Sequence, residues 1–164
     1  MDDATAWNGN WAWSLPLIVI TVVFHVIGLG LLNAPLANLL AIVKGSRYRV
    51  YSFAFVVGVA TIWVTFLHAI EAGIWATAFR LLGAVPTNRS ALLYSLEAIT
   101  TYGHSDLFLA EHWRLMGALE ALNGVILIGL TTAFLYGAIQ RGWPVEKVPH
   151  ASSLPWSRRR HAAE

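Results

Sequence analysis

The sequence predicts an all-α integral membrane protein with three transmembrane helices and one shorter helix that enters the membrane and returns. Three observations predict this fold class. Of the 164 residues, 57% are hydrophobic and only 12% are charged, whereas soluble domains carry about 25% charged residues. Three apolar runs each exceed the roughly 20 residues that a helix needs to cross a bilayer. A fourth apolar segment is too short to cross, and a polar string follows it.

Residues 1–14 are predicted to form an extracytoplasmic N-terminus. They contain Trp7, Trp11 and Trp13 but no basic residue. A secretory signal peptide begins with a basic region, so we expect this start to be retained. Indole rings favour the membrane interface, which places the three tryptophans at the outer surface of the membrane.

Three apolar runs predict the transmembrane helices. Residues 15–43 hold no full charge, and we expect a kink where Asn33 and Pro35 interrupt the run. Residues 50–79 form the second predicted helix and residues 113–140 the third.

The basic residues predict how the chain is oriented. Residues 44–49 join the first two spans and are rich in Lys and Arg, and residues 141–164 form a basic tail after the third span. Cytoplasmic loops carry the excess of Lys and Arg. We therefore expect the chain in the cell inner membrane, with the N-terminus outside and the tail on the cytoplasmic surface. There is no cysteine, which excludes disulfides and thiolate metal sites.

Residues 90–100 predict the short helix, with Ser90 as its N-cap. At about 1.5 Å per residue this helix reaches only halfway across the membrane. The polar string "EAITTYGHSD", residues 97–106, includes its end. Polar backbone at this depth is tolerated only where protein buries it or water lies beside it. Because one chain cannot surround the string, we expect a symmetric homo-oligomer around a wet axis.

The segment "SLEAITTYGHSD" resembles, without gaps, the pore module of the tetrameric potassium channel superfamily, especially its small bacterial members. The resemblance covers residues 50–140, with an outer helix at 50–79, a pore helix at 90–100, a selectivity filter at 101–105 and an inner helix at 113–140. It implies a homotetramer in a lipid bilayer that conducts monovalent cations passively, either K⁺ or K⁺ and Na⁺ with weak selectivity. It implies no enzyme activity, no cofactor, no nucleic-acid partner and no soluble ligand-sensing domain.

The resemblance also assigns roles to individual residues. The filter residues would be Thr101, Tyr102, Gly103, His104 and Ser105. Glu97, Thr100 and Asp106 would support the filter, and Gly124 would be the gating hinge of the inner helix. The glycines of this span could equally allow close packing of helices. Permeating cations would bind transiently at Thr101, Tyr102 and Gly103, with no other metal expected.

The filter sequence departs from the usual TVGYG. Tyr102 replaces valine, His104 replaces tyrosine and Ser105 replaces the second glycine. A residue with a Cβ adopts the left-handed conformation at a cost of about 1–2 kcal/mol, so Ser105 predicts weaker ion selectivity. His104 has two interpretations. Histidine titrates near neutral pH, which would make the filter sensitive to external acid; alternatively, the side chain is a neutral imidazole satisfied by one hydrogen bond.

Four ionisable residues lie within the predicted spans: His25, His68, Glu71 and Glu120. Such residues usually face protein or water and pair with one another. One interpretation is a single polar cluster that braces the pore helix or relays protons. The other is that each side chain is satisfied separately. Glu97 and Asp106 also have two interpretations. Either the two carboxyl groups share a proton behind the filter, or Glu97 faces an outer vestibule.

Two other functions fit parts of the sequence. The chain would be a structural or regulatory membrane protein, derived from a pore, if Ser105 prevents conduction. Alternatively, His25 and His68 would bind haem from neighbouring helices, although this leaves the polar string without a role.

Overall fold

The computed structural model describes residues 3–44, 47–103 and 106–143, and all regular structure in these ranges is helical. The helices are α1 (Asp3–Lys44), α2 (Arg49–Leu81), α3 (Asn88–Ile99), the 3₁₀ turn η1 (Glu111–Trp113) and α4 (Arg114–Gly142). Among them, α1, α2 and the continuous segment of η1 and α4 are long and apolar enough to cross a membrane. This confirms the all-α class and three helices of membrane-spanning length, and it indicates a membrane protein.

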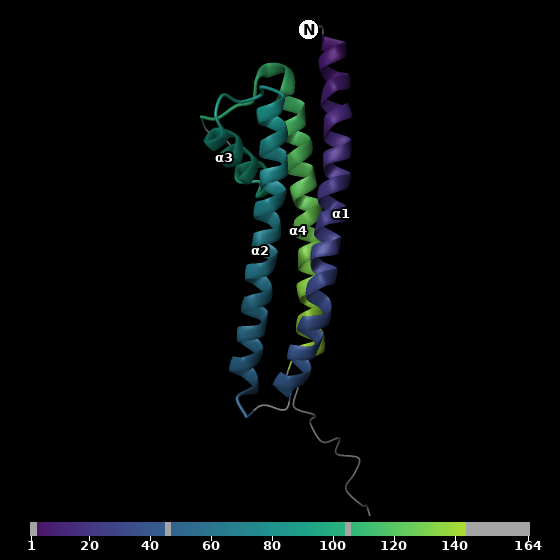
Figure 1. Cartoon of the computed structure of the whole chain (residues 1–164), viewed down its shortest axis with the longest axis vertical. Helices are drawn as coiled ribbons and strands as arrows, with labels where there is room; N and C mark the ends of the chain where they lie inside the picture. Colours follow the sequence, from purple (N-terminus) through teal and green to yellow (C-terminus); the bar gives the residue numbers. More distant parts are fainter. Residues whose placement is uncertain (1–2, 45–46, 104–105, 144–164) are drawn as a thin grey trace, which may run out of the picture.

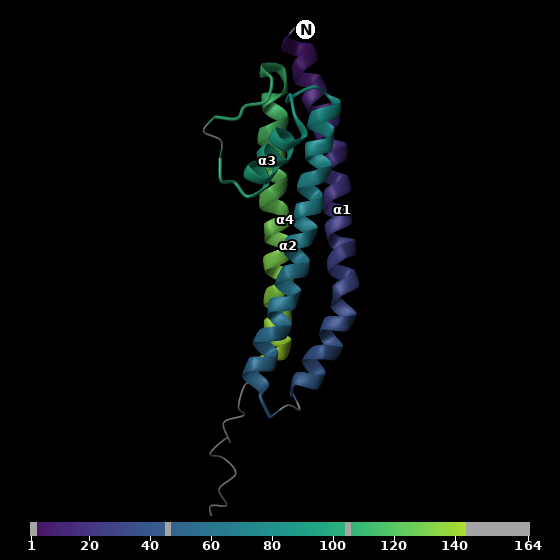
Figure 2. The ribbon, with the colours of Figure 1, turned by 60° about the vertical axis from the view of Figure 1, so that its left-hand side comes forward.

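The three long helices lie side by side, and α3 projects from their flank near the end where α1 begins (Figures 1 and 2). Both connections of α3 run to that same end of the bundle. Helix α3 has 12 residues, or roughly 18 Å of length, and it packs against both α2 and α4. Its bounds, and those of α2 and α4, differ by one or two residues from the expected ones.

Helix α1 begins much earlier than the expected span of residues 15–43. The helix is already formed at Asp3 and continues unbroken through Pro16 and Pro35 to Lys44. The expected start of the first helix at residue 15 was therefore wrong. The physical reason is that Asn10 and Ser14 are buried, so this part of α1 packs within the bundle and its tertiary contacts stabilise it as helix.

The N-cap of α3 is Thr87, and the prediction of Ser90 was wrong. The Thr87 hydroxyl accepts a hydrogen bond from the backbone N–H of Ser90, at 3.1 Å. In return, the backbone N–H of Thr87 donates to the Ser90 hydroxyl, at 3.3 Å. This is a capping box, in which the second residue stands three positions into the helix. Ser90 thus stabilises the start of α3 from inside the helix.

Asn10 of α1 binds the start of α4. Its side-chain oxygen accepts the backbone N–H of Met116 at 2.7 Å, and its side-chain nitrogen donates to the carbonyl of His112 at 2.6 Å. The first N–H groups of a helix have no partner within it. Asn10 therefore acts as a cap supplied by another helix, and it fixes the distance between α1 and α4 at this end.

Replacing Asn10 with alanine is expected to lower the free energy of unfolding by about 1–3 kcal/mol, because two backbone groups would stay buried without a partner. Thermal unfolding in detergent measures the loss. The matched control is Asn8→Ala, since Asn8 lies on the same helix but is exposed. Equal melting temperatures for the two variants would contradict this role of Asn10.

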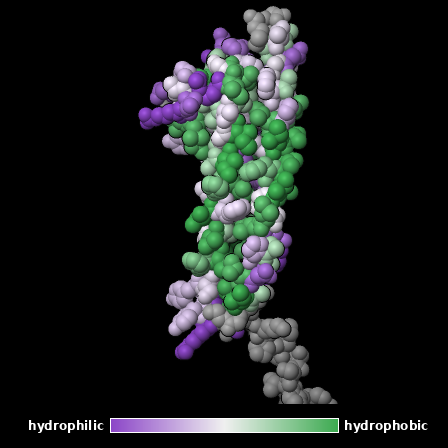
Figure 3. Space-filling model, viewed as in Figure 1, coloured by the Kyte–Doolittle hydropathy of each residue, from purple (hydrophilic) through white to green (hydrophobic). Residues whose placement is uncertain are grey.

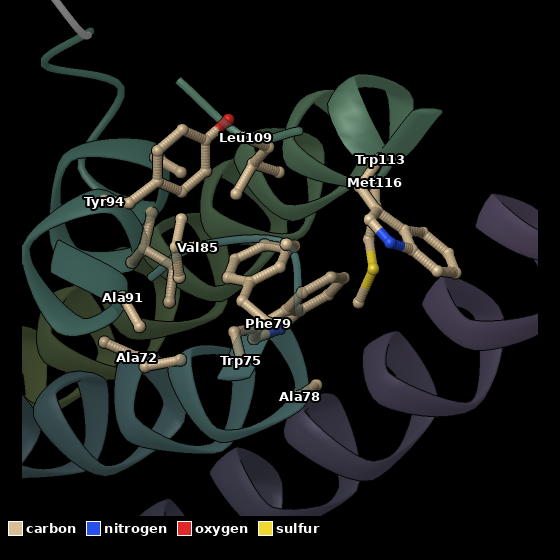
Figure 4. Packing of buried hydrophobic residues seen from close by; sticks show 14 residues of the cluster. Ala72, Trp75, Ala78, Phe79, Val85, Ala91, Tyr94, Leu109, Trp113 and Met116 are labelled. Carbon is tan, nitrogen blue, oxygen red and sulfur yellow. The ribbon is translucent and has the colours of Figure 1, made fainter. Parts of the chain in front are cut away.

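Buried side chains form a core around α3 and a second core toward the opposite end of the bundle. The first includes Trp75, Phe79, Tyr94 and Met116 (Figure 4), and Phe79 meets Tyr94 edge to face with centroids 5.4 Å apart. The second is centred on Leu36, Leu40, Phe53, Val56 and Ala138. Between the two ends, the face of the bundle seen in Figure 3 is largely apolar, which is compatible with contact with lipid.

Candidate functional site

The end of α3 begins the polar string and has a defined capping geometry. The N–H of Thr101 donates to the carbonyl of Ala98, and the N–H of Tyr102 donates to the carbonyl of Glu97, both at 3.0 Å. Thr101 has φ +56°. These two bonds with a left-handed residue form the Schellman motif that commonly ends helices. A threonine in this conformation is unusual and costs about 1–2 kcal/mol, so packing around α3 must hold it there.

Gly103 is the second left-handed residue of the loop, with φ +88°. A Cβ at this position would meet no atom of the described residues within 4 Å. Glycine is therefore required here for its backbone conformation and not for space. Thr101 and Gly103 both have left-handed backbone conformations. Together they determine the backbone conformation of the described part of the loop.

The first four residues after α3 are exposed to solvent in the single chain. Thr100, Thr101, Tyr102 and Gly103 are all exposed, and Tyr102 is 84% exposed. Glu97 is half-buried and, with Thr101 and Gly103, lines a groove against α4. Asp106 is exposed. The other expected filter residues, His104 and Ser105, lie outside the described residues.

The depth of this loop follows from a close contact between two backbones. A Cβ on Gly124 would overlap the carbonyl oxygen of Ile99 and lie 2.7 Å from its Cα. Ile99 is the last residue of α3, and Gly124 lies near the middle of the 32-residue span Glu111–Gly142. The polar loop therefore begins against the middle of a helix of membrane-spanning length. Gly124, expected as a hinge, is a position at which α4 lies directly against the backbone of α3.

Glu120 lies apart from the other three ionisable residues of the spans and contacts α3 instead. The Ser95 hydroxyl contacts the Glu120 carboxyl and also donates to the backbone carbonyl of Ala72, at 2.8 Å. All three residues are fully buried. This contact joins α2, α3 and α4, and it holds the short helix in place. Ser95 was not singled out from the sequence; its signal is a position on the buried face of α3, shared with Ala91 and Ile99.

Tyr94 lies one position before Ser95 on α3. Burial raises the pKa of its hydroxyl to about 12, and the Glu120 carboxyl adds to the shift. The unfolded chain loses this proton near pH 10, so the folded state binds it more tightly between these values. The stability that this proton contributes is complete below pH 10 and is lost as the pH rises through about 12.

A spectrophotometric titration of the phenolate band tests this shift. Tyr94→Phe, which keeps the aromatic contact with Phe79, should remove one phenol from the titration near pH 12. The difference between the two curves should vanish at lower pH. Removal of a phenol that titrates near pH 10 would contradict the burial of Tyr94.

The other three ionisable residues meet Thr131 in what we call the histidine cluster: His25, His68, Glu71 and Thr131. The two carboxylate oxygens of Glu71 contact Nδ1 of His25 at 2.8 Å and Nδ1 of His68 at 3.1 Å. The Thr131 hydroxyl contacts Nε2 of the same histidines, at 3.0 Å and 3.2 Å respectively. The cluster is thus a closed ring of four contacts that joins α1, α2 and α4.

Close packing of α1 and α2 brings the cluster together. Gly28 has no side chain, and a Cβ there would lie 2.6 Å from the side chain of Leu67. One turn before Leu67, Trp63 donates its indole N–H to the carbonyl of Gly28, at 3.0 Å. These contacts place His25, one turn before Gly28, beside His68. The spacing of His68 and Glu71 was visible in the sequence, but the third helix contact, Thr131, was not assigned to them.

The imidazoles of His25 and His68 have centroids 5.1 Å apart and planes inclined by 30°. Glu71 occupies one side of the pair and Thr131 the other. A haem plane between the two rings would have to break these contacts. No family model, curated protein or solved structure matches the chain, so the residues themselves carry the functional argument.

Proposed function

We propose that the chain is one subunit of a homotetrameric channel that conducts monovalent cations passively, K⁺ or K⁺ with Na⁺. The observation that carries this proposal is the position of the exposed polar loop. It begins at Ile99, against the middle of the span Glu111–Gly142, and Thr100 to Gly103 are uncovered in the single chain. Lipid cannot hydrogen-bond such backbone. Several copies of the chain around a water-filled central axis would shield the loop from lipid and expose it to ions.

The chemistry of the loop favours cations. The carboxyl end of a helix carries a partial negative charge, and α3 ends at Ile99. Carbonyl oxygens of Thr101, Tyr102 and Gly103 would replace part of the water shell of the ion. Glu97 and Asp106 add acidic groups on either side of these residues. The driving force would be the electrochemical gradient, with no covalent step.

The proposal places the chain in the cell inner membrane. The basic residues between α1 and α2 and those of the tail would lie on the cytoplasmic side. Helix α3 would then enter from the outer side and return there as a pore helix. The N-terminal end of α1 lies at the same end of the bundle as both connections of α3 (Figure 1).

Ion flux from liposomes tests the proposal. Purified full-length protein is reconstituted with internal K⁺, and efflux is followed after dilution into a K⁺-free medium. The expected result is K⁺ efflux well above that of empty liposomes, with a smaller or equal flux of Na⁺. Protein that reconstitutes as an oligomer and passes neither ion would overturn the proposal and favour a structural or regulatory membrane protein.

The absence of cysteine allows a second test of the wet loop. Tyr102→Cys should react with a charged, membrane-impermeant thiol reagent added from outside, because water reaches the proposed axis. The control is Ile62→Cys on α2, which is 72% exposed in the single chain but would face lipid or a neighbouring subunit. Equal and negligible labelling of both positions would contradict a wet axis.

A further inference from the structure

The histidine cluster has a feature that the proposed pore does not use. Its side chains supply fewer hydrogen atoms than their contacts with one another require. Two neutral imidazoles supply one N–H each, and a threonine supplies one O–H. An ionised Glu71 only accepts. Three hydrogens are thus available for the four contacts among His25, His68, Glu71 and Thr131. One of the four contacts therefore lacks a hydrogen atom, and either one further proton or one metal ion would remove this mismatch.

We infer that His25, His68 and Glu71 form a binding site for a divalent transition-metal ion such as Zn²⁺. Their nitrogen and oxygen ligand atoms all lie within 4.8 Å of one another. Two imidazoles with a carboxylate suit zinc, copper, nickel and iron better than calcium or magnesium. The site is separate from the proposed filter, because its ligands come from α1 and α2 and not from the loop after α3.

The three ligands are close enough for metal coordination after the side chains adjust. Zinc takes imidazole nitrogen at about 2.0–2.1 Å and carboxylate oxygen at about 2.0–2.2 Å. Tetrahedral ligands at these distances are roughly 3.3–3.5 Å from one another. The Nδ1 atoms of His25 and His68 now lie 2.8 Å and 3.1 Å from the Glu71 oxygens. One ligand atom from each of the three residues lies within 4.8 Å of the other two, so rotations of the side chains between rotamers would bring them to these separations.

Thr131 completes the site as the partner of both ligands. When the ion is bound on the Nδ1 side, each imidazole carries its hydrogen on Nε2. A hydroxyl oxygen has two lone pairs, and Thr131 Oγ1 already lies 3.0 Å and 3.2 Å from the two Nε2 atoms. Metal-bound histidines commonly donate their other N–H to such a partner, which fixes their orientation. Metal binding therefore uses every ring nitrogen of the cluster.

The burial of the three ligands leaves one approach. His25 and Glu71 have side chains that are 0% exposed, whereas the His68 side chain is 21% exposed. An ion and a fourth ligand would enter beside His68. A resident metal was not predicted, since His68 and Glu71 form the single His-x-x-Glu pair of the predicted spans. The third ligand, His25, comes from α1.

Isothermal titration of zinc tests the inference. Full-length protein in detergent, treated with EDTA and dialysed, is titrated with ZnCl₂. We expect one ion per chain. Glu71→Gln should weaken the affinity by about 100-fold or more. The matched control Glu120→Gln changes another fully buried carboxyl outside the cluster and should bind zinc like the unchanged protein.

X-ray absorption at the zinc edge covers the case in which Glu71→Gln fails to fold. The unchanged protein with one equivalent of zinc should show two imidazoles and oxygen ligands. A protein that binds no zinc, a variant that keeps full affinity, or a spectrum without imidazole would each overturn the inference. These measurements do not involve ion flux, so their failure leaves the proposed channel to its own test.

Discussion

Replacing Gly103 with alanine is expected to reduce K⁺ flux at least tenfold while the protein still folds. Gly103 has φ +88°, and a Cβ makes this conformation less favourable by about 1–2 kcal/mol. The added methyl meets no described atom within 4 Å, so the cost is conformational and not steric. The backbone would relax toward negative φ, and the neighbouring carbonyl groups would turn away from the axis. Reconstituted flux per assembled protein measures the effect.

Gly58→Ala is the matched control for this variant. Gly58 lies within α2, is not among the glycines with positive φ, and has no described atom within 4 Å of an added Cβ. Alanine there should leave flux unchanged and stabilise the helix slightly, by about 0.5–1 kcal/mol. Wild-type flux through Gly103→Ala would show that the loop conformation does not matter for conduction.

Replacing Gly124 with alanine is expected to displace α3 and lower the free energy of unfolding by about 1–3 kcal/mol or more. The new Cβ would overlap the backbone oxygen of Ile99, and backbone atoms cannot move aside as a side chain does. The end of α3 would shift away from α4 and disturb the loop that follows it. Thermal unfolding in detergent and flux in liposomes should both decline.

Gly129→Ala distinguishes close packing from bending. Gly129 lies on the same helix, and an added Cβ meets no described atom within 4 Å. Alanine there should be tolerated and should slightly favour the helix. If Gly124 were needed only as a hinge, its alanine variant would keep the stability of Gly129→Ala and change flux alone. Equal stability and equal flux for the two variants would contradict both roles.

The three long helices and the short one were predictable because their signals are local. An apolar run of sufficient length predicts a span whatever surrounds it. The capping box of Thr87 and Ser90 was readable in principle, since both residues stand at the correct spacing. The start of α1 was not readable, because Asn10 belongs to the helix through its bonds to His112 and Met116, about a hundred residues away.

The ionisable residues show the same division. His68 and Glu71 share a helix face by spacing alone, so their proximity was predictable. The separation of Glu120 from the histidines was not predictable from the sequence. The depth of Glu120 relative to α1 depends on how far the helices are shifted along one another. Glu120 and Thr131 share a face of α4, but about three turns separate them, or roughly 16 Å. Thr131 reaches the histidines, and Glu120 reaches Ser95 of α3.

The most direct test of the channel is an electron cryo-microscopy map of the full-length chain in lipid nanodiscs with K⁺ present. The expected map contains four copies around one axis, with residues 101–103 of each copy beside that axis and ion density between them. A monomer, or an assembly in which these residues face the lipid, would contradict the proposed pore.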